Sequence, residues 1–173
     1  AYEITYGDWS SDVCSSDLEY ETYSTQAADV FAMAQEEPMA SVELPMGQLG
    51  THPMSMLAST FLFDSYCHLR HDLLAPGGPL DRTEPPRDEA RLQPTIEWML
   101  AGLPWMCAEE LTGLDRPVAL VLEGPGGGTW TIAPGGPEGR VTLTAGGSGA
   151  AATVTSDGHS FRSEEHTSEL QSP

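Results

Sequence analysis

Two side chains that could bind a metal lie four residues apart in the sequence, Asp64 and His68. On a helix, positions i and i+4 stand one turn apart and point the same way. A carboxylate and an imidazole placed like this suit a divalent metal such as zinc, which accepts oxygen and nitrogen donors. A catalytic zinc normally has three protein ligands and an open position, so the pair predicts only part of a site.

The spacing alone leaves a simpler interpretation open, in which Asp64 only hydrogen-bonds His68 on a half-buried helix. His71 is a less favoured additional ligand, because a His between Arg70 and Asp72 is equally ordinary on an exposed helix face. The metal prediction therefore rests on Asp64 and His68.

Several other residues with suggestive chemistry have simpler explanations. His52 lies twelve residues before Asp64, roughly 18 Å of helix rise, which is too far to complete the same site. Cys67 points about 100° away from the Asp64 face, so we predict a packed thiol rather than a nucleophile. The Gly-rich segments 124–128 and 134–137 lead into neither Lys-Ser/Thr nor a helix, which indicates hairpin turns rather than phosphate loops. Trp98 and Trp105 are predicted to pack in a core.

The apolar pattern predicts three helices followed by strands. Helical spacing favours residues 24–37, ending before Pro38, and residues 51–74 after a loop through 45–50. Thr95 is expected to cap a third helix, which buries Ile96, Met99, Leu100, Leu103 and Met106 and ends at Gly113. From residue 117 the period changes towards two, which predicts short strands at 118–122, 129–132, 141–144 and 152–155. Residues 157–160 are expected to open a further helix. This order indicates an α+β fold, with the small sheet taken as antiparallel and a boundary near residues 113–116.

The two ends of the chain resemble translated adapter DNA. Residues 8–18 and 162–172 can be encoded by two DNA strings that are reverse complements of each other, a relation that unrelated protein ends have no physical reason to satisfy. We therefore expect residues 1–18 and 162–173 to be non-native, to specify no element and to pack poorly. The chain is then expected to be a fragment at both ends.

The charge of residues 19–161 excludes one large class of partner. They contain nineteen Asp and Glu against six Arg and no Lys, a net charge of −13. Nucleic acid would be repelled, since phosphate binding uses Lys and Arg clusters. No apolar run approaches the ~20 residues that cross a bilayer, and two scattered cysteines make no disulfide framework. We expect a cytoplasmic bacterial protein, with no membrane partner, that acts on a small-molecule substrate; its oligomeric state stays open.

Residues 47–80, GQLGTHPMSMLASTFLFDSYCHLRHDLLAPGGPL, resemble the metal-binding helix of the maleylpyruvate isomerase family, a branch of the DinB-like helical bundles. Members carry an acidic residue, three residues, a metal-binding His, and shortly afterwards Asp with Leu or Ile. Asp64 and His68 fit, with Asp where Glu is common, and Asp72 falls one place later than in the family. Residues 116–161 resemble the sterol-carrier-like α/β domain that often follows, mainly through the strand pattern and the GTWT of residues 128–131.

This resemblance implies a partial helical metal-binding domain over residues 19–113 and a partial α/β domain over 114–161. It also implies a metal-dependent isomerase or thiol transferase with zinc at Asp64 and His68 and with mycothiol as the thiol, although no residue identifies the mycothiol site. The family's remaining ligand is a His on an upstream helix that this sequence lacks, so we expect weak zinc binding and no activity. The alternative is a non-catalytic module that holds an apolar small molecule.

Overall fold

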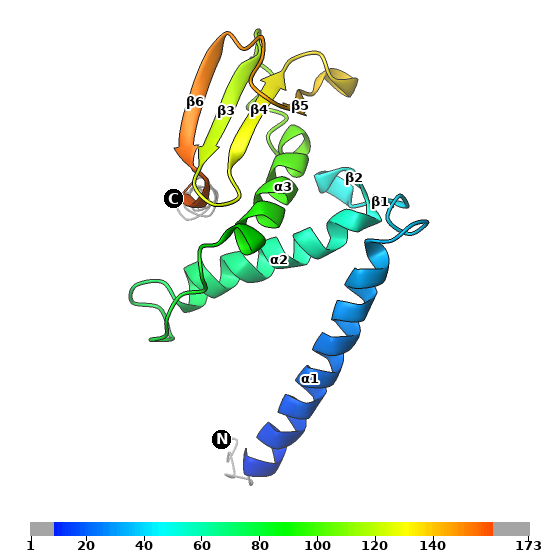
Figure 1. Cartoon of the computed structure of the whole chain (residues 1–173), viewed down its shortest axis with the longest axis vertical. Coiled ribbons are helices and arrows are strands. Elements are labelled where there is room, and N and C mark those ends of the chain that lie inside the picture. The colour runs from blue at the N-terminus through cyan, green and yellow to red at the C-terminus, as the bar shows by residue number, and fades with distance from the viewer. Residues whose placement is uncertain (1–8, 161–173) are drawn as a thin grey trace, which may run out of the picture.

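The structure is a computed structural model that describes residues 9–160, with side chains from residue 17 onward. Helices come first and a sheet follows, which confirms the predicted α+β class (Figure 1). No helix in the described part of the chain is both long and apolar enough to cross a membrane.

The helices are α1 (Trp9–Ala34), α2 (Leu57–Cys67) and α3 (Glu89–Met106), and the strands are β1 (Glu43–Pro45), β2 (Thr51–Pro53), β3 (Val118–Glu123), β4 (Gly128–Ala133), β5 (Thr142–Ala145) and β6 (Ala152–Asp157).

Helix α1 begins earlier than predicted and extends away from the rest of the molecule (Figure 1). The expectation that residues 1–18 specify no element is wrong for residues 9–18, because no Gly or Pro interrupts the chain between residues 9 and 34. Asp17 and Leu18 are exposed, as expected for the adapter-like segment. The side chains of residues 1–16, and all of residues 162–173, lie outside the described part.

The second predicted helix starts later than expected, because residues 51–53 form a strand instead of a cap. Strand β2 pairs antiparallel with β1, with Leu44 opposite His52, so the predicted loop is partly a hairpin. A short 3-10 turn, Met54–Met56, leads into α2, and the π-helical segment η3, His68–Leu73, continues it. The predicted end at Leu74 is confirmed.

Helix α3 begins six residues before the predicted cap. Asp88 is the N-cap, and its side chain accepts a hydrogen bond from the backbone amide of Arg91 at 3.1 Å. Thr95 is fully buried inside the helix, where its hydroxyl donates to the carbonyl of Leu92 at 2.7 Å. The helix ends at Met106 rather than Gly113, and Met106 is exposed, contrary to the prediction.

The four predicted strands of the second half form one sheet in the order β5-β4-β3-β6. The two hairpins are antiparallel, whereas β6 pairs parallel with β3, so the sheet is mixed. The connection from β5 to β6 passes over the sheet at Gly147, where a Cβ atom would lie 2.9 Å from Thr129 Cγ2 and 3.6 Å from Ala119 Cβ. A side chain at this position would not fit without displacing these neighbours.

One cluster of buried apolar residues joins the helices to the sheet, and α3 is at its centre. It comprises Tyr66, Leu92, Ile96, Met99, Leu100, Leu120, Leu122, Ile132 and Val141. Because α3 packs on the sheet with one part of its surface and on α2 with another, the sheet fixes the position of α2 through α3. The domain boundary near residue 113 stays a prediction.

Candidate functional site

Asp64, His68 and Asp72 occupy successive turns on the exposed side of α2 and η3. Nε2 of His68 lies 3.4 Å from Oδ1 of Asp64, and Nδ1 of the same ring lies 2.5 Å from Oδ2 of Asp72. Tyr66 and Cys67, on the other side of α2, are buried. The burial of that opposite side anchors the helix and leaves the three polar side chains facing solvent.

The π-helical segment η3 determines where Asp72 lies. Its backbone shows the bond characteristic of this geometry, from the amide of Leu74 to the carbonyl of Leu69 at 3.0 Å, five residues apart. Positions i and i+4 lie one turn apart on the same side of this segment, as they do on an α-helix. Asp72 therefore lies one turn beyond His68, within hydrogen-bond distance of its ring.

The two carboxylates raise the pKa of His68. The hydrogen bond to Asp72 is the largest cause, and the negative charge of Asp64 follows it. Because an ionised carboxylate can only accept, Asp72 holds the proton of the neutral imidazole on Nδ1. The lone pair of the neutral ring is then on Nε2, the nitrogen on the side of Asp64.

The donor atoms on that side match a divalent metal in type and spacing. Two ligands at the usual zinc distances of about 2.1 Å, at a tetrahedral angle, stand roughly 3.4 Å apart. The separation of His68 Nε2 and Asp64 Oδ1 is also 3.4 Å. A carboxylate on the far nitrogen, as Asp72 supplies here, is the usual support of a metal-binding His.

The structure brings no third ligand to Asp64 and His68 among the residues whose side chains it describes. Among residues 17–160, whose side chains the structure describes, no group of three or more His, Cys, Asp or Glu comes together in a way that could hold a metal ion. His71 is half-buried in η3 and does not complete such a group.

His52 lies in strand β2 and not at the start of the predicted second helix, whereas Cys67 is buried as predicted. His52 is buried, hydrogen-bonded to the carbonyl of Leu49 at 2.6 Å and in edge contact with the ring of Trp98. Cys67 is buried as well. The predicted core packing of Trp98 is also confirmed, since its side chain is buried.

Sequence reasoning missed a buried cation directly behind the site. Arg70 is buried, and its guanidinium donates to the hydroxyl of Tyr66 at 2.6 Å and to the carboxylate of Glu84. Arg87 also donates to Glu84, at 3.1 Å. This network fastens the Pro-rich connection between η3 and α3 to the segment that carries His68. The only sequence signal for it was the concentration of charge in that connection.

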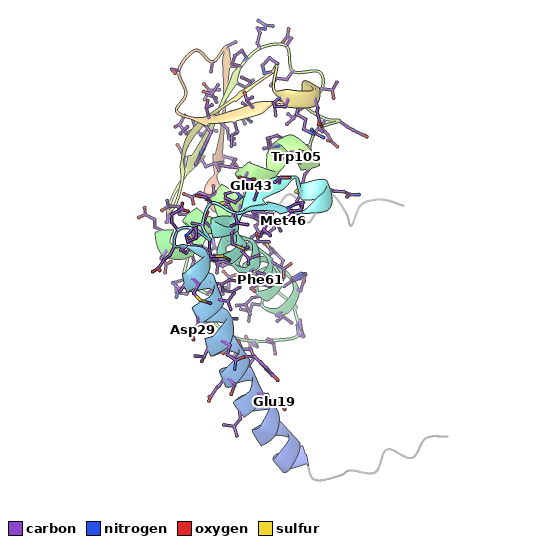
Figure 2. All side chains as sticks on the ribbon, turned by 90° about the vertical axis from the view of Figure 1, so that its right-hand side faces the viewer. Glu19, Asp29, Glu43, Met46, Phe61 and Trp105 are labelled. Carbon is purple, nitrogen blue, oxygen red and sulfur yellow. The ribbon has the colours of Figure 1, made fainter. Side chains whose placement is uncertain are left out.

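Among the hollows elsewhere in the described part of the chain, two border the end of α3. The first, about 540 Å³, is lined by the 47–49 turn, Trp105 and Arg140, and the guanidinium of Arg140 stacks 3.9 Å from the centre of the Trp105 ring. Figure 2 shows Trp105 beside the hairpin residues Glu43 and Met46. The prediction of core packing is therefore incomplete for Trp105, which is half-buried and lines a hollow.

The second hollow, about 250 Å³, lies between the end of α3 and the sheet and has an entirely apolar lining. Its walls are Leu103, Leu111, Leu114, Val118, Leu120, Ile132 and Val154. No polar side chain would fix the orientation of a molecule inside it.

Comparison with known proteins adds no further constraint on the site. No protein-family model matches the chain. Neither the curated proteins nor the solved structures give a match.

Proposed function

We propose that this chain is part of a cytoplasmic metal-dependent enzyme, an isomerase or thiol transferase, whose metal is held by Asp64 and His68. The observation that supports it best is the 3.4 Å separation of His68 Nε2 and Asp64 Oδ1, with Asp72 on the opposite nitrogen of the ring. Zinc is the metal that this donor pair favours. The resemblance of residues 47–80 to the maleylpyruvate isomerase family points the same way.

The π turn also accounts for the one departure in spacing from that family. Asp72 falls one residue later than in the family pattern, and a π turn accommodates one more residue than an α turn. The extra residue is absorbed within η3, and the carboxylate still reaches the imidazole.

In this proposal each side chain has a separate role. Asp64 and His68 bind the metal, and Asp72 keeps the proton of His68 on Nδ1 so that Nε2 is available. When bound, a divalent metal lowers the pKa of a coordinated thiol and polarises a substrate carbonyl. The thiol of the proposal is mycothiol.

Cobalt(II), a spectroscopic substitute for zinc, tests this proposal on the full chain. Absorption is recorded as cobalt is added, with and without an excess of a small monothiol. We expect a thiolate-to-cobalt absorption band that needs both the added thiol and His68, and that His68→Ala abolishes. An equally strong band in His68→Ala would reject the proposal, as would a band of unchanged strength without added thiol, which would indicate ligation by the chain's own cysteines.

The apolar hollow favours a second candidate function, the binding of an apolar small molecule. Its volume of about 250 Å³ and its purely aliphatic lining suit a short acyl chain or a compact hydrocarbon. Val118 and Leu120, on strand β3, form part of its wall. The function would need neither Asp64 nor His68.

A fluorescent fatty-acid probe separates this candidate from the first. Val118→Phe fills the hollow, so we expect it to reduce probe binding at least tenfold while His68→Ala leaves binding unchanged. Unchanged binding in a folded Val118→Phe variant would rule out the hollow as the binding site.

A further inference from the structure

Helix α1 has an apolar face that the rest of the chain covers at one end only. Near its C-terminal end, Phe31 packs against Phe61 of α2 with the ring centres 5.2 Å apart, and Ala34 is buried. Gln35, just beyond the helix, donates to the carbonyl of Ser55 at 2.7 Å. These contacts define an existing interface between α1 and the start of the α2 segment.

The same face continues towards the N-terminus without a cover. Tyr20, Tyr23, Ala27 and Val30 follow one another at spacings of three and four residues and end at Ala34, so all lie along one side of the helix. All four are exposed, and Tyr20 is 75% exposed. Phe61 is 54% exposed even though it contacts Phe31. Helices α1 and α2 diverge from this contact, which leaves both apolar surfaces open (Figure 1).

The part of the chain that forms this surface carries only negative charge. Residues 17–69, whose side chains the structure describes, contain eight Asp and Glu and no Lys or Arg. Glu19 and Asp29 lie along α1, as Figure 2 shows. Asp64 is exposed one turn beyond Phe61 on α2.

This charge discriminates between possible occupants. A second copy of the chain would bring an equal number of carboxylates against these, and an anionic lipid surface would also be repelled. A cationic partner would be attracted and steered to the surface. An amphipathic helix meets the apolar requirement as well, because its i, i+3 and i+4 positions form a matching stripe.

We propose that the exposed face of α1 and the adjoining Phe61 form a docking surface for a basic amphipathic helix of a partner protein. Its apolar stripe would cover Tyr20, Tyr23, Val30 and Phe61, as a continuation of the contact between Phe31 and Phe61. Its Lys and Arg side chains would lie beside Glu19, Asp29 and Asp64. The stretch from residue 19 to residue 34 is about 24 Å long, so a partner helix of roughly four turns fits it.

Designed peptides of one composition test this surface. A labelled 18-residue Leu/Lys peptide with its Leu on one helical face is compared, by fluorescence anisotropy, with a peptide in which the same residues are scrambled. We expect one-to-one binding of the amphipathic peptide, at least tenfold tighter than that of the scrambled one and weaker as salt is added. The double variant Tyr23→Ser/Val30→Ser should lose about tenfold, and Leu80→Ser, a similarly exposed leucine in the connection between η3 and α3, should lose nothing.

A charge-reversal variant checks specificity if the Ser variants lose helix by circular dichroism. Glu19→Lys/Asp29→Lys should weaken binding of the Leu/Lys peptide and strengthen binding of a Leu/Glu peptide with the same pattern.

Equal binding of the amphipathic and scrambled peptides would overturn the proposal. Self-association of the chain that strengthens as salt rises would overturn it too, and would indicate a second copy as the occupant. Binding to neutral phosphatidylcholine vesicles that the double variant abolishes would indicate a membrane instead.

Discussion

Asp72 lies one turn after His68 in the π-helical segment η3, with its Oδ2 2.5 Å from Nδ1 of the His68 ring. This contact is the largest cause of the raised pKa of His68, ahead of the charge of Asp64. We therefore expect Asp72→Asn to lower the pKa of His68 more than Asp64→Asn does. Titration of the His68 ring protons by NMR measures both, and a larger effect of Asp64→Asn would contradict the assigned geometry.

The same contact determines how stability depends on pH near neutrality. The folded-state pKa of His68 is raised above its usual value, so the stabilisation is fully present below the unfolded-state pKa and is lost as pH rises through the folded-state value. The effect should be small, because His68, Asp64 and Asp72 are all exposed. Urea unfolding across this pH range should show a decline that His68→Gln removes, and an unaltered decline in that variant would assign it to another group.

Glu84 should be needed for the stability of the folded chain, mainly because Arg70 is buried. Glu84→Gln leaves a buried guanidinium without its counter-charge, so we expect a clear loss of stability in urea unfolding. Removing both charges in Arg70→Met/Glu84→Gln should restore part of the lost stability, because an apolar side chain needs no counter-charge at the buried position 70. Arg87→Gln, which removes the more exposed partner of Glu84, is the matched control and should have little effect. A double variant less stable than Glu84→Gln alone would contradict this account.

Acid should weaken the same network. Arg87 and then Arg70 lower the pKa of Glu84, so its contribution is present above the unfolded-state pKa and is lost as pH falls through the folded-state value. The acid side of the stability profile should therefore flatten in Glu84→Gln. An identical acid limb in the wild type and in this variant would show that Glu84 does not contribute there.

Gly50 should tolerate substitution much less well than Gly47, three residues earlier. Both have positive φ, but a Cβ at Gly50 would lie 2.3 Å from Cε2 of Trp105, whereas nothing lies within 4 Å of one at Gly47. We expect Gly47→Ala to lower the free energy of unfolding by about 1 kcal/mol and Gly50→Ala by about 3 kcal/mol, since steric overlap adds to the backbone strain. Similar losses in denaturant unfolding would show that Trp105 does not pack against the hairpin.

The sequence predicted the strands better than the helix boundaries, for physical reasons. A short continuous apolar run identifies β3 and alternation identifies β4, because both patterns are local and Gly-rich segments bound them. Thr95 has the chemistry of a cap, yet Asp88 caps α3 and Thr95 packs inside the helix. The parallel pairing of β6 depends on a connection that crosses the sheet, which no local pattern shows.

The candidate site likewise has contacts that local spacing predicts and contacts that only the folded chain creates. The Asp64 and His68 pairing follows from helical spacing alone, and the structure places both on one exposed face. The contact with Asp72 also spans four residues, so helical spacing permits it, whereas the π-helical backbone of this segment is not revealed by spacing. Burial of Arg70 depends on a partner fourteen residues away, Glu84, which only the folded chain brings near.

Zinc titration of the full chain, followed through the imidazole signals of its five histidines by NMR, tests the proposed metal centre most directly. The account predicts that zinc perturbs His68 first and at Nε2, that Asp72→Asn weakens the effect, and that Asp64→Asn largely removes it. With two ligands from this pair the binding should be weak, roughly a hundredfold or more below that of a complete three-ligand site. Perturbation of His52 or His159 before His68, or an undiminished response of His68 in Asp64→Asn, would contradict it.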